Sequence, residues 1–89
     1  MNTESILKQY FDLFKKMRNE SQFNRKVELN MVTQKFKEAN GIVVIPKQGG
    51  LNGMSVILLN GIPSGEIVPK YSKDYETIKS FSLLVYPES

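Results

Sequence analysis

The stretch IVVIPKQGGLNGMSVILLNG, residues 42–61, contains two short apolar runs separated by a connection rich in glycine. The first run, residues 42–45, is β-branched throughout and ends at Pro46, which is typical of a strand. Residues 54–59 form a second apolar run of strand length. The Asn60-Gly61 pair after it predicts a tight hairpin turn, because both residues tolerate positive φ. This stretch therefore predicts an antiparallel sheet in the second half of the chain.

The connection between the two runs, residues 48–53, raises the question of whether its glycines bind a phosphate. A P-loop ends in Gly-Lys-Ser/Thr, and a dinucleotide-binding turn has the spacing G-x-G-x-x-G before a helix; neither pattern occurs here. We therefore predict a bend between strands. The alternative is a small-ligand site, for example for a nucleotide, in which backbone N–H groups form an anion-binding nest. Its residues would be Lys47, Gly49, Gly50 and Asn52.

The first forty residues predict helices. Apolar residues at helical spacing over residues 3–18 form a stripe about 160° wide, which is typical of an amphipathic helix. Residues 18–24 then indicate a loop. We predict a second helix over residues 27–39, ended by Gly41 in the left-handed conformation that closes many helices. A short strand at 26–31 before a shorter helix is the alternative, because apolar residues also alternate there.

The rest of the chain predicts two further strands. A turn is expected at residues 63–65, and Pro63 and Pro69 would confine the strand around them to a sheet edge or a short length. Residues 70–80 are expected to form a loop with one helical turn, and residues 80–86 to form the closing strand. Helices followed by strands predict an α+β fold: two N-terminal helices packed on one face of a small antiparallel sheet of three to four strands. The 89 residues are expected to form a single domain, 1–89.

The composition excludes several kinds of catalysis. The chain has no histidine and no cysteine, so it lacks Ser-His-Asp and Cys-His catalysis and imidazole or thiolate zinc ligands. The closest carboxylates, Asp74 and Glu76, are too few for a calcium site. We therefore predict a protein that is not an enzyme and binds no metal or other cofactor. No apolar run reaches the length of a membrane span, and we predict a cytoplasmic protein without membrane contact.

The net charge of +3 lies entirely in residues 1–40, which carry eight Lys or Arg and five Asp or Glu. This basic half supports an alternative hypothesis of nucleic-acid binding through contacts with phosphates. The residues that would make these contacts are Lys15, Lys16, Arg18, Arg25 and Lys26. No recognised nucleic-acid motif accompanies them.

The leading hypothesis is a small protein-binding module that docks on a larger protein, as phage or mobile-element inhibitors of similar composition do. Its contacts would come from the apolar stripe of the first helix and from a sheet edge near the C-terminus. The predicted contact residues are Tyr10, Phe11, Phe14 and Met17 on the helix, with Phe81 and Tyr86 on the edge. The stripe could instead form the seam of a homodimer.

Overall fold

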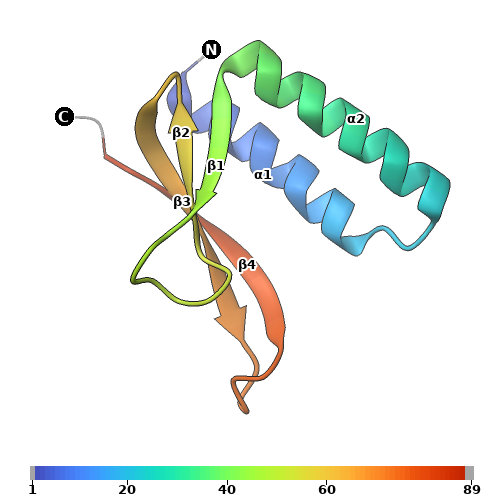
Figure 1. Ribbon diagram of the computed structural model, residues 1–89, viewed down its shortest axis with the longest axis vertical. Helices are drawn as coiled ribbons and strands as arrows, with labels where there is room; N and C mark the ends of the chain where they lie inside the picture. The colour runs from blue at the N-terminus through green and yellow to red at the C-terminus, as the bar shows by residue number, and fades with distance from the viewer. Residues whose placement is uncertain (1, 88–89) are drawn as a thin grey trace.

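The computed structural model describes residues 2–87 and contains two helices followed by a four-stranded antiparallel sheet (Figure 1). The elements are α1 (Thr3–Asn19), α2 (Phe23–Asn40), β1 (Ile42–Pro46), β2 (Ser55–Leu59), β3 (Ile62–Tyr71) and β4 (Ile78–Val85). The strands lie in chain order, so β1 and β4 form the two edges of the sheet. The predicted α+β class, with the helices N-terminal to the sheet, is confirmed.

Both helices begin and end where local signals place them, with one exception. Asn2 caps α1, because its side-chain oxygen accepts a hydrogen bond of 2.8 Å from the Ser5 N–H. Gly41 closes α2 with a φ of 64°, as predicted. The exception is the start of α2 at Phe23, which leaves only residues 20–22 as a loop between the helices. The predicted loop was therefore too long, and the alternative strand at 26–31 is wrong because these residues lie within α2.

Alternation along the strands gives the sheet one face that packs on the helices. In the β1–β2 pair, Ile42 lies opposite Leu59 and Val44 opposite Ile57, and these side chains share that face with Ile67 of β3. Leu7 and Tyr10 of α1 pack onto them to form the buried core. The helices α1 and α2 contact each other, α1 contacts β3 and β4, and α2 contacts β1.

β3 differs most from the prediction. It is ten residues long and lies between β2 and β4, although it contains Pro63, Gly65 and Pro69. A register shift opposite Ile57 and Leu58 leaves Ser64 without a partner in β2, and such bulges tolerate proline. The pairing with β2 also ends at Ile67, so Pro69 has a neighbouring strand on only one side. The predicted turn at 63–65 and the predicted edge position are therefore wrong.

The last connection and the last strand agree with the prediction more closely. Residues 72–77 form turns and bends without the expected helical turn, and the Ser72 N–H donates to the Thr77 carbonyl across the base of the hairpin. β4 begins two residues earlier than predicted and ends at Val85. Tyr86 extends the pairing, because its N–H donates a 3.0 Å hydrogen bond to the Ser64 carbonyl.

Candidate interaction surfaces

The sheet face opposite the helices is unusually apolar. Side chains that alternate with the core residues point to this face, and six of them are aliphatic: Val43, Ile45, Val56, Leu58, Val68 and Leu84. We call this surface the open face. Val43 is 52 % exposed, Ile45 43 % and Leu84 50 %. An antiparallel sheet with one solvated face normally carries polar residues there, so the open face is more apolar than such a face usually is.

A single carboxylate lies at the centre of the open face. Glu66 is only 5 % exposed, and its Oε2 atom accepts hydrogen bonds from the Tyr86 hydroxyl and from the Lys47 ammonium, the latter at 3.0 Å. The hydrogen bond from Tyr86 and the ion pair with Lys47 lower the pKa of Glu66 below its ordinary value. The same carboxylate raises the pKa of Tyr86 to about 12. These contacts fix the start of the glycine connection and the end of the chain described here to the middle of the sheet.

The Glu66 cluster predicts a loss of stability in acid. Because the pKa of Glu66 is lower in the folded state, its contribution is present above the ordinary carboxyl pKa of 4.5 and is lost as the pH falls through the lowered value. Glu66→Gln should reduce the free energy of unfolding at neutral pH by about 1–2 kcal/mol. In urea unfolding at a series of pH values, this difference should shrink below pH 4.5. A difference that stays constant down to the acid limit of folding would contradict the prediction.

The glycine connection is tied to the sheet by hydrogen bonds. The Lys47 N–H donates to the Met54 carbonyl, and the Tyr71 hydroxyl donates to the Asn52 carbonyl. Gly49 has a φ of 76°, which favours glycine, and an added Cβ at Gly50 would meet the Met54 sulfur at 2.8 Å. These contacts support a bend between β1 and β2. The ammonium of Lys47, which the small-ligand alternative required for an anion, is already paired with Glu66.

The predicted contact residues of α1 mostly serve the core. Tyr10 is 6 % exposed, and Phe11, Phe14 and Met17 are half-buried. The Phe14 ring meets the Phe81 ring edge-on, with 5.0 Å between the centroids. Tyr10 is therefore not available to a partner in this fold, and the other three side chains expose only part of their surface. Of the predicted edge residues, Phe81 is half-buried and Tyr86 is held by Glu66.

Four of the five predicted basic residues lie close together. Lys15, Lys16 and Arg25 line a shallow depression of about 700 Å³ between the helices, with Asp12 and Glu20 also in its wall. Lys15 and Arg18 also line a smaller depression of about 130 Å³, together with Lys79 and Phe81 of β4. We call Arg25, Lys16, Lys15, Arg18 and Lys79 the basic belt. Lys26 lines neither depression, so it is outside the belt.

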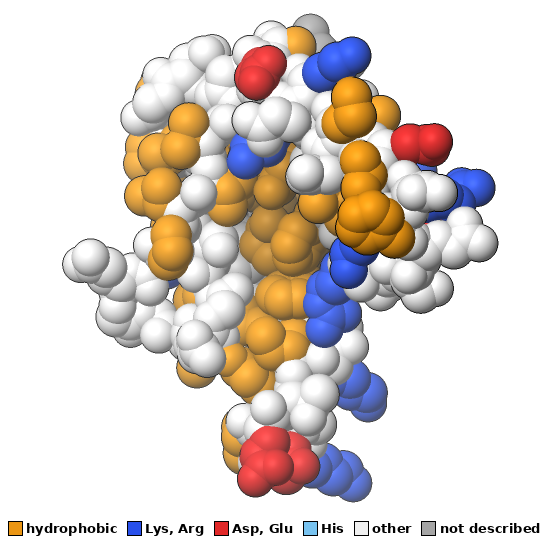
Figure 2. All heavy atoms as spheres, turned by 45° about the vertical axis from the view of Figure 1, so that its right-hand side comes forward, with side chains coloured by type: hydrophobic (Ala, Val, Ile, Leu, Met, Phe, Trp, Pro, Cys, Tyr) orange, Lys and Arg blue, Asp and Glu red, His pale blue; other side chains and the backbone are white. Residues whose placement is uncertain are grey.

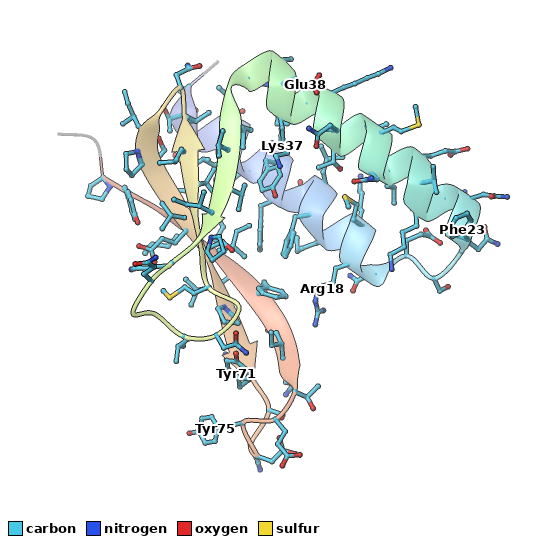
Figure 3. The ribbon with its side chains drawn as sticks, in the orientation of Figure 1. Arg18, Phe23, Lys37, Glu38, Tyr71 and Tyr75 are labelled. Carbon is cyan, nitrogen blue, oxygen red and sulfur yellow. The ribbon has the colours of Figure 1, made fainter. Side chains whose placement is uncertain are left out.

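The basic belt passes from the helices onto the edge strand through Arg18. Its guanidinium lies 4.9 Å from the centre of the Phe81 ring, and it donates a 3.1 Å hydrogen bond to the Ile78 carbonyl (Figure 3). Sequence reasoning missed Lys79, because it is 61 residues from Arg18 in the chain and no local pattern joins them. It also missed the open face, although the uninterrupted apolar runs 42–45 and 56–59 indicate strands that are apolar on both sides.

A second exposed apolar surface runs along the outside of α2. Phe23, Val27 and Met31 recur every four residues, and their exposed fractions are 78 %, 43 % and 56 %. In Figure 2, hydrophobic side chains follow this helix and also fill the floor of the hollow between α2 and β1. The two helices therefore cover only part of the apolar surface that the chain carries.

Residues 2–87 include no cluster of three or more carboxylates that could hold a metal ion. In the same part of the chain, neither helix combines the length and the apolarity needed to cross a bilayer. Comparison of the chain with protein-family models, with curated proteins and with solved structures finds no match. The proposals below therefore depend on the surfaces alone.

Proposed function

We propose that this chain is a non-enzymatic protein-binding module whose main contact surface is the open face. The observation that carries the proposal is a solvated sheet face with six aliphatic side chains around a carboxylate already neutralised by Lys47. Burying such a face excludes water from apolar groups and leaves no unpaired charge at its centre, because Glu66 keeps both of its donors.

The exposed area of the chain supports a partner. Its accessible surface is 6447 Å², whereas a folded monomer of 10.2 kDa typically exposes about 5,300 Å². The surplus of about 1,100 Å² is comparable to the roughly 800 Å² that each partner buries in a standard interface. The radius of gyration agrees, at 13.5 Å against about 12 Å for a compact chain of this length. The chain thus exposes more surface than a compact monomer of the same mass, and the difference is about the area that one interface buries.

The partner that fits the open face is a larger protein with its own aliphatic patch. Three half-exposed side chains of the two edge strands, Val43, Ile45 and Leu84, would lose the most exposed apolar surface in this contact. Inhibition of a host protein in the cytoplasm, as predicted from the composition, is the activity that we propose for this contact. A second copy of the chain is the competing occupant, and the test distinguishes the two.

Photo-crosslinking tests this proposal. Val43 is replaced by benzoyl-phenylalanine in the native cells, and Lys73, an exposed residue at the β3–β4 hairpin, is replaced in the same way as the matched control. We expect irradiation to give a discrete adduct with another protein from position 43 and none from position 73. Adding Ile45→Lys, a change at a 43 % exposed side chain, should reduce the adduct at least tenfold while the far-ultraviolet circular dichroism stays unchanged.

Three results would oppose the proposal. Equal labelling from positions 43 and 73 would mean that the open face has no specific occupant. An adduct of twice the chain mass, with a dimer in sedimentation equilibrium that Ile45→Lys dissociates, would assign the open face to self-association. Turnover of a substrate by purified protein, abolished by one point substitution, would show that the module is an enzyme after all.

A further inference from the structure

β4 presents a free edge. It is the last strand of the sheet order and pairs on one side with β3, so the backbone groups on its other side have no strand partner within residues 2–87. Its first carbonyl, that of Ile78, is occupied by Arg18. Beyond Ile78 the strand alternates regularly: Phe81, Leu83 and Val85 are half-buried beneath the helices, whereas Ser80, Ser82 and Leu84 are exposed on the open face.

The basic belt begins beside this edge, on the helix side of the sheet, where Lys15, Arg18 and Lys79 line one depression with β4. It continues away from the edge between the helices, through Lys16 and Arg25. It comprises five cations, and two carboxylates, Asp12 and Glu20, lie among them. Each carboxylate forms one ion pair of 3.7 Å, Asp12 with Lys15 and Glu20 with Arg25. The excess of three positive charges attracts an anionic partner to the helix side of β4, and this attraction is sensitive to salt.

We propose that the β4 edge and the basic belt together bind an extended acidic segment of another protein by strand addition. The free backbone groups of β4 require a partner with its own row of N–H and C=O groups at strand spacing, which a polypeptide has and a nucleic acid lacks. The belt requires that this polypeptide be acidic. The inference uses the backbone edge of β4 and the basic belt, whereas the open-face contact uses side chains of all four strands. The two surfaces adjoin at Leu84, but the tests differ, so either proposal can fail without the other.

The two sides of β4 also specify the pattern of the bound segment. Side chains of an added strand point alternately to the two faces of the sheet. Those on the helix side face the belt and should be Asp or Glu. Those on the other side extend the open face next to Leu84 and should be aliphatic. The recognised sequence is therefore an alternation of acidic and aliphatic residues, without proline in the paired stretch.

Fluorescence anisotropy with defined peptides tests the inference. The probe is a labelled peptide of ten residues that alternates Glu and Val. One control peptide has Lys at every Glu position, a second has proline at two central Val positions, and a third probe is single-stranded oligo-dT. We expect binding of the Glu-Val peptide that weakens with salt, binding at least tenfold weaker for the proline peptide, and none for the Lys peptide. Binding should protect amides of residues 80–84 from hydrogen exchange.

A matched pair of charge variants locates the binding site. Lys16→Glu with Lys79→Glu reverses two exposed charges of the basic belt, and Lys35→Glu with Lys73→Glu reverses two exposed charges outside it. Both double variants have the same net charge, so a difference between them reports position. We expect the belt variant to bind the Glu-Val peptide at least tenfold more weakly than the control variant, which should stay within about threefold of the original chain.

Four outcomes would overturn the inference. Equal affinity for the proline and Glu-Val peptides would mean attraction by charge without strand addition. Tighter binding of oligo-dT, in competition with the peptide, would assign the basic belt to nucleic acid. Equal losses in the two double variants, or no binding of the Glu-Val peptide at low salt, would remove the site from this surface. None of these outcomes depends on whether the open face has an occupant.

Discussion

Leu7→Ala is expected to lower the free energy of unfolding by about 2–5 kcal/mol. Leu7 is fully buried where α1 meets the sheet, and it packs with Tyr10, Ile57 and Ile67 in the core. Alanine would remove three carbon atoms and leave a cavity that the surrounding strands can fill only in part. A chain of this length has a small total stability, so the variant should be largely unfolded at moderate temperature.

Urea unfolding followed by circular dichroism measures this loss. Leu51→Ala is the matched control, because the same atoms are removed from a side chain that is 56 % exposed in the glycine connection. The control should change the free energy of unfolding by less than about 0.5 kcal/mol. Similar losses in the two variants would show that α1 does not pack on the sheet through Leu7.

Gly65→Ala should reduce the free energy of unfolding by about 1–3 kcal/mol, although it adds a single methyl group. A Cβ at Gly65 would lie 2.7 Å from the Leu84 carbonyl oxygen and 3.0 Å from a methyl of Leu7. The carbonyl belongs to the neighbouring strand, so relief requires movement of β4 or of α1. Gly65 is thus required for the close approach of these elements, and not for the turn that Pro63-Ser64-Gly65 suggests.

The control for Gly65→Ala is Gly50→Ala in the connection between β1 and β2. An added Cβ there would also meet an atom closer than 3.0 Å, but that atom is the sulfur of Met54, at the end of a flexible side chain. Gly50→Ala should therefore leave the thermal midpoint nearly unchanged or raise it slightly, because alanine restricts the unfolded chain. A lower midpoint for Gly50→Ala than for Gly65→Ala would contradict this explanation.

Signals within a few residues of one another predicted most elements correctly. The apolar stripe of residues 3–18 corresponds to α1, and Gly41 ends α2 as expected. Asn60 and Gly61 have φ values of 50° and 83°, which is the hairpin geometry that this pair favours. These features depend on local backbone preferences and on periodicity, and both can be read from sequence. The start of α2 and the form of residues 72–77 were local errors, whereas the errors in β3 and at Tyr10 fell where segments distant in the chain meet.

The candidate surfaces also depend on contacts between segments that are distant in the chain. The sequence of β3 suggests a broken segment, because Pro63 and Pro69 lack the N–H donors that a central strand normally needs. Their positions are acceptable only because of the bulge and because the pairing with β2 stops at Ile67. Glu66 looks like a solvated acid until Lys47 and Tyr86 converge on it from opposite ends of the sheet. Tyr10 was predicted to be a contact residue of the apolar stripe. It is buried because, like Leu7, it packs in the core between α1 and the sheet.

What the sequence by itself determined is the α+β class, the order of its helices and strands and the lack of imidazole and thiol chemistry. Only the tertiary structure decided which apolar residues stay exposed, and that Lys79 joins Arg18 beside a free strand edge. The physical reason is strand register. Local preferences decide whether a segment is extended, whereas the pairing of distant strands decides which of its two faces the helices cover.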